Sequence, residues 1–208
     1  MRTARSGGSP GDVGLLKAEL FGVRTPPAIA ERLSEASLDG YLPEPKLTDL
    51  RRMARGTLGR EYAELLADND LQPFFISSDL RPRALQHTYL MRYIATHDFI
   101  HLVTGFDTGW AGELGVLAAT VEQGFAPGGT AQEWAARVYY PARDFANRKA
   151  IRRNRRLGHV LGRDANYLLT YRYEDNLERP LAVVRRELKL PSPEESGIAF
   201  PIRSQGVA

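Results

Sequence analysis

The sequence predicts an all-α protein that folds as a single compact multi-helix domain. Apolar residues recur mostly at the three- and four-residue spacing of an amphipathic helix, and the alternation typical of strands is scarce. Prolines and glycines mark the starts and ends of these segments, where they suit helix termini. The chain has 208 residues, of which 43% are hydrophobic and 25% charged. This is an ordinary composition for one globular domain.

The order of these segments divides the chain into three parts. Residues 1–14 are rich in glycine, serine and proline and predict a flexible N-terminal tail. Residues 15–190 form the all-helical domain, and residues 191–208 follow as a loose C-terminal tail, because prolines end the last helix. Helices are expected in this domain within 25–40, 48–55, 58–67, 82–104, 110–123, 130–140, about 142–163 and 173–190.

Charge and cysteine content exclude several classes of protein. The formal net charge is +3, a bias too small to indicate nucleic acid as a partner. The chain has no cysteine, which excludes disulfides and thiolate chemistry. No apolar run approaches the roughly 20 residues of a spanning helix, and the first residues lack the apolar core of a secretory signal. We therefore expect a cytoplasmic protein.

Two of the four histidines lie in the segment "HDFIHLVTGFDTGWAGE", which runs from His97 to Glu113. A helix turns by about 100° per residue, so Asp98 lies at about 100° and His101 at about 40° from His97, on one arc. Gly105 then ends the helix, and the eleven residues that separate His101 from Glu113 are enough to reverse the chain. Two imidazoles and two carboxylates that converge between adjacent helices predict a site for zinc, iron, cobalt or manganese.

Spacing alone leaves alternatives to this metal site open. The two histidines could be core groups whose hydrogen bonds are satisfied by Asp98 and the backbone. A metalloprotease motif of the H-E-x-x-H kind is disfavoured, because Asp98 is one methylene shorter than glutamate and reaches a metal-bound water less easily. Asp98 itself is either a metal ligand or a group that orients His101.

The same segment carries a resemblance to a known family. The pattern H-D-x-x-H, eleven residues and E resembles the metal motif of coenzyme Q biosynthesis protein four, and it lies here at His97, Asp98, His101 and Glu113. Flanking segments are also similar, from "LTDLRRMARGTLGREYAELLADNDLQP" to "LGRDANYLL" and "PLAVVRRELKL", whereas the turn "FDTGWAG" departs from the pattern. The resemblance covers about residues 47–190. It implies that the four motif residues bind a divalent metal, with zinc favoured over iron, cobalt or manganese.

The resemblance also implies a function in ubiquinone biosynthesis. The family is associated with removal of the C1 carboxyl group of a polyprenylated 4-hydroxybenzoate, a metal-dependent decarboxylation in which Asp98 would be catalytic. A polyprenyl tail needs an apolar channel, for which we expect Tyr93 and Leu117 as substrate-binding residues. The alternative is a non-catalytic scaffold that binds isoprenoid lipid, organises other quinone-biosynthesis proteins and uses the metal structurally. A homodimer is a further expectation, and nucleic acid is not expected as a partner.

A third interpretation is a phosphohydrolase of the helical histidine–aspartate class. That chemistry needs another histidine from a different helix. His87 lies ten residues before His97, about 280° round the same helix, and so points elsewhere. This function is therefore disfavoured, and no role is predicted for His87 or His159.

A basic segment, "NRKAIRRNRRLGHVLGR", places four arginines on one stripe of a helix, namely Arg148, Arg152, Arg155 and Arg156. Such a stripe is either a solvated face or a contact with anionic lipid headgroups, to which each arginine contributes about 1 kcal/mol. For a protein with a lipid substrate, the second interpretation predicts peripheral association with a membrane surface. That surface would be the cytoplasmic membrane of a bacterium or the matrix side of the mitochondrial inner membrane of a eukaryote.

Overall fold

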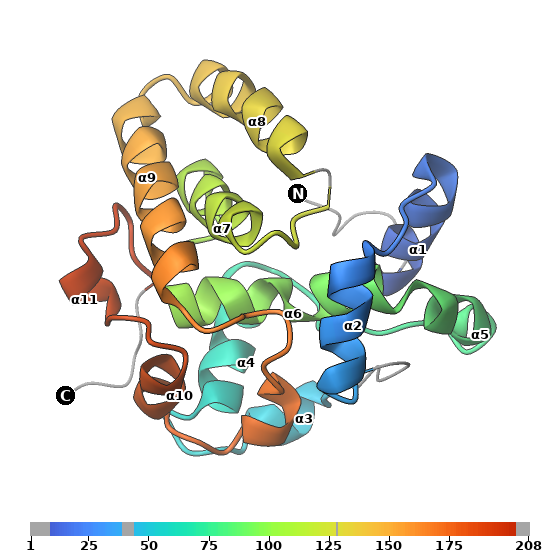
Figure 1. The fold of residues 1–208 in the computed structure, drawn as a ribbon. Coiled ribbons are helices and arrows are strands. Elements are labelled where there is room, and N and C mark those ends of the chain that lie inside the picture. The colour runs from blue at the N-terminus through green and yellow to red at the C-terminus, as the bar shows by residue number, and fades with distance from the viewer. Residues whose placement is uncertain (1–8, 39–43, 128, 203–208) are drawn as a thin grey trace.

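The structure of the protein, a computed structural model, describes residues 9–38, 44–127 and 129–202. Regular secondary structure in these residues is helical apart from isolated β-bridges, so the predicted all-α class is confirmed. Within the same residues, no helix is both long enough and apolar enough to span a membrane. Figure 1 shows the helices, which are α1 (Pro10–Phe21), α2 (Pro27–Glu35), α3 (Leu47–Leu50), α4 (Leu58–Asp68), α5 (Arg81–Ala84), η1 (Leu85–His87), α6 (Thr88–Thr104), α7 (Trp110–Glu122), α8 (Gly129–Arg143), α9 (Arg148–Asp164), η2 (Tyr173–Asn176), α10 (Leu181–Glu187) and α11 (Pro193–Ser196).

Helix α6 lies at the centre of the fold. It crosses the middle of the molecule, with α7 and α9 on one side and α3, α4 and α10 on the other (Figure 1). Helices α1 and α2 also contact α6. The helix ends at Gly105, whose φ of 85° is a left-handed conformation that favours glycine. The helix that carries both predicted histidine ligands is therefore surrounded by other helices and ends at a defined residue.

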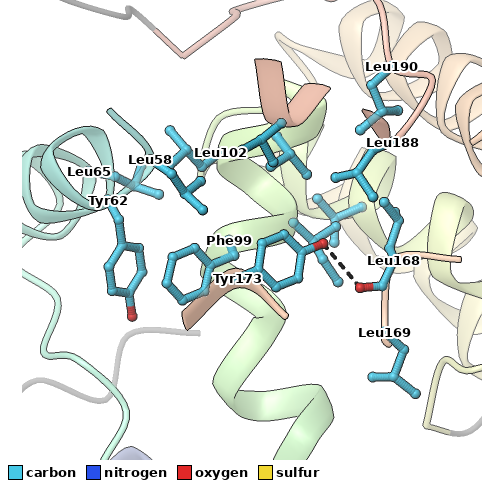
Figure 2. Packing of buried hydrophobic residues seen from close by; sticks show 14 of the residues in the cluster. Leu58, Tyr62, Leu65, Phe99, Leu102, Leu168, Leu169, Tyr173, Leu188 and Leu190 are labelled. Atoms are coloured by element: carbon cyan, nitrogen blue, oxygen red, sulfur yellow. Dashed lines mark hydrogen bonds between the residues drawn. The ribbon is translucent and has the colours of Figure 1, made fainter. Parts of the chain in front are cut away.

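An aromatic stack fixes α6 against the half of the molecule that contains α4. Phe99 of α6 lies between Tyr62 of α4 and Tyr173 of η2, with ring centroids 4.0 Å and 5.1 Å away and nearly parallel planes. All three side chains are buried, and the hydroxyl of Tyr173 donates to the carbonyl of Leu168 over 3.1 Å (Figure 2). Stacked aromatic pairs contribute about 0.5–1.5 kcal/mol beyond the burial of their area. The stack therefore strongly constrains the position of α6.

Two buried arginines tie α6 to the C-terminal part of the chain. Arg92 of α6 forms an ion pair with the buried carboxylate of Glu174. Arg185 of α10 donates to the carbonyls of Leu102 over 2.9 Å and Val103 over 3.2 Å, in the last turn of α6. A helix C-terminus carries partial negative charge, so a guanidinium group is favourable there. Both ends of α6 are therefore held by buried charged groups that have partners.

Helices α7 and α9 pack with their backbones in contact because glycines lie where they meet. A Cβ atom on Gly158 would lie 2.1 Å from the carbonyl oxygen of Gly115, and one on Gly162 would lie 2.5 Å from that of Ala119. Gly115 also faces the ring of Phe106, which a Cβ atom would approach to 2.6 Å. Larger side chains at these positions would force the backbones apart. The position of α7 is therefore fixed relative to both α9 and the turn before it.

The predicted N-terminal tail is too long. Helix α1 begins at Pro10, and Leu15 within it is fully buried. Gly14 lies so close to α6 that a Cβ atom would be 2.1 Å from the Cδ1 atom of Ile94. The segment after Pro10 therefore belongs to the domain, because its packing partner is a distant helix that local composition does not reveal. Residues 1–8 of the predicted tail lie outside the described residues.

The predicted C-terminal tail packs on the turn after α6 as far as Ile202, so it is not loose over this length. The amide of Ile202 donates to the carbonyl of Gly105 over 2.9 Å, and Pro201 forms a β-bridge with the next residue of the turn. Pro193 of α11 is buried, and a Cβ atom on Gly105 would lie 2.6 Å from its ring. This segment therefore supports the turn between α6 and α7. Residues 203–208 of the predicted tail lie outside the described residues.

Several predicted helices have different boundaries in the structure. The helix expected within 48–55 is confined to α3, which ends at Leu50. The segment 82–104 is divided into α5, η1 and α6, because His87 leaves the helical conformation with a ψ of 41°. The segment 173–190 is divided into η2 and α10 at Pro180, which has no amide hydrogen to donate. The helix expected at 130–140 continues through Pro141 to Arg143 as α8, and the helix expected from about 142 begins only at Arg148 as α9.

We predict that Gly158→Ala destabilises the protein, although alanine favours a helix more than glycine does. The added methyl group would meet the carbonyl of Gly115 and force α7 and α9 apart, at an expected cost of about 1–3 kcal/mol in the free energy of unfolding. Val160→Ala, at an exposed position of α9, is the control and should change that free energy by less than about 0.5 kcal/mol. Urea denaturation measures both. A Gly158→Ala protein as stable as the parent would contradict the close helix contact.

Candidate metal centre

The turn between α6 and α7 brings three of the predicted ligands together. His97 and His101 lie one turn apart on α6, and Glu113 lies in the first turn of α7, after the chain has reversed. One nitrogen or oxygen atom from each of these residues lies within 4.8 Å of the others. The sequence predicted this convergence between adjacent helices from the helical spacing and from the glycine that ends α6.

The donor atoms of this group are spaced as ligands of a single ion would be. The Nε2 atom of His97 lies 3.7 Å from one oxygen of Glu113, and the Nε2 atom of His101 lies 3.7 Å from the other. Two ligands that each lie about 2.0–2.2 Å from zinc at a tetrahedral angle are roughly 3.4 Å apart. The observed distances are too long for hydrogen bonds. They leave room for a cation between the side chains, and the residues present fit a divalent metal.

His101 has the most fixed orientation of the three donors. It is 0% exposed, and its Nδ1 atom lies 3.1 Å from the carbonyl oxygen of Phe106. A carbonyl only accepts, so this contact places the proton on Nδ1 and leaves the lone pair of Nε2 facing Glu113. Among the described residues, Nε2 is buried with no hydrogen-bond partner. An unpaired buried polar atom costs about 1–3 kcal/mol, a cost that a bound cation would remove.

The facing charges keep the carboxylate of Glu113 ionised. Burial alone would raise its pKa, but the imidazoles of His101 and His97 bring the pKa to about 2. For His101, burial lowers the pKa, and the nearby carboxylates of Glu113 and Asp98 more than offset this and raise it. At neutral pH the carboxylate of Glu113 is therefore negatively charged and faces the two imidazoles. A divalent cation would compete with a proton for His101.

Asp98 lies beside this group rather than within it. Its Oδ1 atom is 3.5 Å from the Nδ1 atom of His97, whereas the Nε2 atom of the same ring faces Glu113. The spacing of the motif left two roles open for Asp98, as a ligand or as a group that orients an imidazole. The observed position suits the orienting role, although toward His97 rather than toward His101.

The two predicted substrate-binding residues have different surroundings. Tyr93 meets the ring of His97 edge-on, with centroids 5.8 Å apart. Burial, followed by the charge of Glu113, raises the pKa of Tyr93. Leu117 is buried in an apolar cluster with Leu114 that α7 shares with α8 and α9. Tyr93 therefore borders the candidate metal centre, whereas Leu117 contributes to the packing of three helices.

Asp107, in the turn before α7, was not predicted as part of the site. A Cβ atom on Gly112 would lie 1.8 Å from the backbone oxygen of Asp107, so glycine is needed for α7 to begin this close to the turn. The Oδ1 atom of Asp107 is buried without a partner in the described part of the chain. Burial raises the pKa of Asp107, and the nearby charge of His101 offsets only part of this effect. The sequence feature that could have indicated Asp107 is its position between Gly105 and Gly109, in the turn that departs from the family pattern.

The predicted arginine stripe divides in the structure. Arg152, Arg155 and Arg156 line a pocket between α8 and α9. Arg148 does not line it, and its guanidinium carbon lies 3.9 Å from the centre of the Phe145 ring. The four arginines therefore have different surroundings, and contact with a membrane stays a prediction.

His159, for which the sequence predicted no role, connects three helices. Its Nδ1 atom lies 3.0 Å from the carboxylate of Glu122 on α7, and its Nε2 atom lies 2.9 Å from that of Glu133 on α8. Arg155, one turn earlier on α9, also donates to Glu133 over 2.9 Å. These partners are distant in the sequence, so no local pattern could reveal the network.

The fold and the site together define an all-helical protein in which two histidines of one helix and a glutamate of the next form a candidate metal centre. A family model described as coenzyme Q (ubiquinone) biosynthesis protein Coq4 matches residues 42–194. The chain belongs to this family, which confirms the resemblance seen in the sequence. A crystal structure of a protein from Nostoc punctiforme, named as a candidate ubiquinone biosynthesis protein, has a similar fold, with a TM-score of 0.60 and 22% identity over 86% of this chain and 80% of that chain. No curated protein matches the sequence significantly.

We predict that the protein purified with zinc holds one metal ion per chain and that His101→Ala removes it. A ligand present at about 100 times its dissociation constant stabilises the folded chain by about 2.7 kcal/mol. Zinc should therefore raise the Tm of the parent and not that of the variant. His87→Ala, which removes a histidine outside the group, is the control. Elemental analysis gives the metal content. Full occupancy in His101→Ala would rule out this assignment.

Proposed function

We propose that this chain is a metal-dependent enzyme of ubiquinone biosynthesis, which removes the C1 carboxyl group from a polyprenylated 4-hydroxybenzoate. One observation carries the proposal: the candidate centre has three protein donors and is partly accessible. His101 is buried, whereas the side chains of His97 and Glu113 are 26% and 21% exposed. Structural zinc sites are closed by four protein ligands, but catalytic zinc sites keep a position for water or substrate. Membership of a family named for ubiquinone biosynthesis supports the substrate class.

Each residue of the group has a distinct part in the proposed reaction. His101, held by the carbonyl of Phe106, and Glu113 would bind the metal from facing helices, and His97 would complete the donor set from the accessible side. Zinc is the metal we expect from this set. When bound, it supplies a Lewis acid that stabilises negative charge on a carboxylate or phenolate oxygen. Asp98, beside Nδ1 of His97, would keep that imidazole oriented with Nε2 toward Glu113.

The proposed chemistry needs charge stabilisation and one proton. The hydroxyl group para to the carboxyl pushes electrons toward the ring carbon that bears the carboxylate. A proton adds to that carbon, the carbon–carbon bond breaks, and carbon dioxide leaves, so one proton is consumed for each carboxylate lost. The phenol of Tyr93 is protonated at neutral pH, as tyrosine normally is, and burial and Glu113 raise its pKa further. Its hydroxyl would donate a hydrogen bond to a substrate oxygen at the edge of the site.

A second function, the non-catalytic scaffold that binds isoprenoid lipid and other quinone-biosynthesis proteins, is favoured by a different observation. Helix α8 exposes three large apolar side chains, since Trp134, Val138 and Tyr139 are 68%, 64% and 52% exposed. Exposed apolar side chains that gather on one surface mark interaction sites. In this function the metal would only fix α6 against α7.

We predict that metal-loaded protein releases labelled carbon dioxide from carboxyl-labelled polyprenyl 4-hydroxybenzoate in detergent micelles. Glu113→Gln keeps the size of the side chain but removes its charge, so metal and turnover should be lost together. Asp98→Asn should keep most of the metal and lower kcat by about 10–100-fold, the usual effect of a partner that orients a ligand. His87→Ala should behave like the parent.

Metal content and substrate binding measured on the same samples separate the two functions. Trapped carbon dioxide is counted with and without oxygen, because an oxygen-dependent route would also release it. Protein that holds the metal and binds the prenylated acid, yet releases no carbon dioxide in either condition, would contradict the enzyme and favour the scaffold.

A further inference from the structure

A pocket of about 340 Å³ lies between α8 and α9, and none of the candidate metal ligands lines it. Two of its lining residues are apolar and fully buried, namely Ile151 of α9 and Leu114, which follows Glu113 on α7. Its volume falls within the range of small-molecule sites, roughly 300–1,000 Å³. The pocket is also lined by four arginines from two helices, Arg137 of α8 and Arg152, Arg155 and Arg156 of α9.

The positive charge around this pocket is only partly neutralised. Arg155 donates to the carboxylate of Glu133 over 2.9 Å, and His159 shares that carboxylate. Arg137, Arg152 and Arg156 form no ion pair or side-chain hydrogen bond with a partner in the described part of the chain. Like charges around one cavity repel one another, and an anion between them replaces that repulsion with attraction. The charges that line the pocket therefore favour the binding of an anionic group.

We propose that this pocket binds a phosphate group. A phosphate monoester carries a charge of about −1.5 to −2 at neutral pH and has three strong acceptor oxygens, so it can meet several guanidinium groups at once. Arginine presents paired N–H donors that match phosphate oxygens. A carboxylate has one charge and two oxygens and would leave more of these donors without a partner. The proposal does not depend on decarboxylation, because it rests on residues outside the candidate metal centre.

Two sources of the phosphate group fit this chemistry, a soluble phosphate ester and the headgroup of an anionic phospholipid. Helix α8, which contributes Arg137 and Pro141 to the pocket, also exposes Trp134, Val138 and Tyr139. Tryptophan and tyrosine are enriched at the headgroup level of membranes. The recognition of the phosphate group is the same in both cases, so the site can be tested first and its source second.

Calorimetric titration of the full-length protein with inorganic phosphate and with diphosphate tests the site. We expect saturable binding, and an affinity about tenfold weaker when Arg137→Gln or Arg152→Gln removes one charged hydrogen bond. Arg137 is informative because it lies on α8 and not on the stripe of α9. Arg148→Gln is the matched control, since it removes the same charge from α9 at a position outside the pocket, and it should bind like the parent. The metal content and Tm of each variant show that the metal and the fold are retained.

Co-sedimentation with phosphatidylcholine vesicles, with and without phosphatidic acid, identifies the source. Binding that requires phosphatidic acid, and that weakens with Arg137→Gln but not with Arg148→Gln, assigns a lipid headgroup. Phosphate binding in solution without vesicle binding assigns a soluble ester, and either result supports the proposal. It would be overturned if neither phosphate nor phosphatidic acid bound. Equal losses in Arg148→Gln and Arg152→Gln would also overturn it, because a diffuse basic surface behaves in that way.

Discussion

The complete burial of His101 is the constraint on which the site depends. Its Nδ1 atom donates a hydrogen bond to the carbonyl oxygen of Phe106. The other ring nitrogen, Nε2, is buried without a partner in the described residues. Such an arrangement costs stability unless something binds there. Glu113 and His97 face the same point at distances suited to a shared ion. A cation would therefore satisfy the buried nitrogen and the ionised carboxylate together.

The rest of the fold holds the two sides of the site independently. On α6, the stack around Phe99 and the guanidinium group of Arg185 fix the helix that carries the imidazoles. On the other side, Gly112 and Gly158 let α7 approach both the turn and α9, which fixes the carboxylate. The C-terminal segment closes over the turn between them through Ile202. The distance across the site is therefore set by packing elsewhere, as a preorganised binding site requires.

The sequence predicted those parts of the fold and the site that depend on local signals. Helical periodicity gave the all-α class, and the spacing around Gly105 gave the reversal that brings Glu113 to the histidines. Contacts between distant segments could not be predicted, because they depend on how the helices pack. Arg137 joins the arginines of α9 only through the packing of α8. A helical wheel placed Asp98 on the same arc as the histidines. It did not show that the carboxylate of Asp98 lies near Nδ1 of His97, whereas Nε2 of that ring faces Glu113.

His97, His101 and Glu113 are expected to bind one metal ion between α6 and α7. Diffraction data collected on both sides of the zinc absorption edge, from crystals grown with zinc, test it most directly. We expect one anomalous peak about 2.0–2.2 Å from the Nε2 atoms of both histidines and from a carboxylate oxygen of Glu113. A zinc peak bound by other residues, with none between these three ordered side chains, would contradict it.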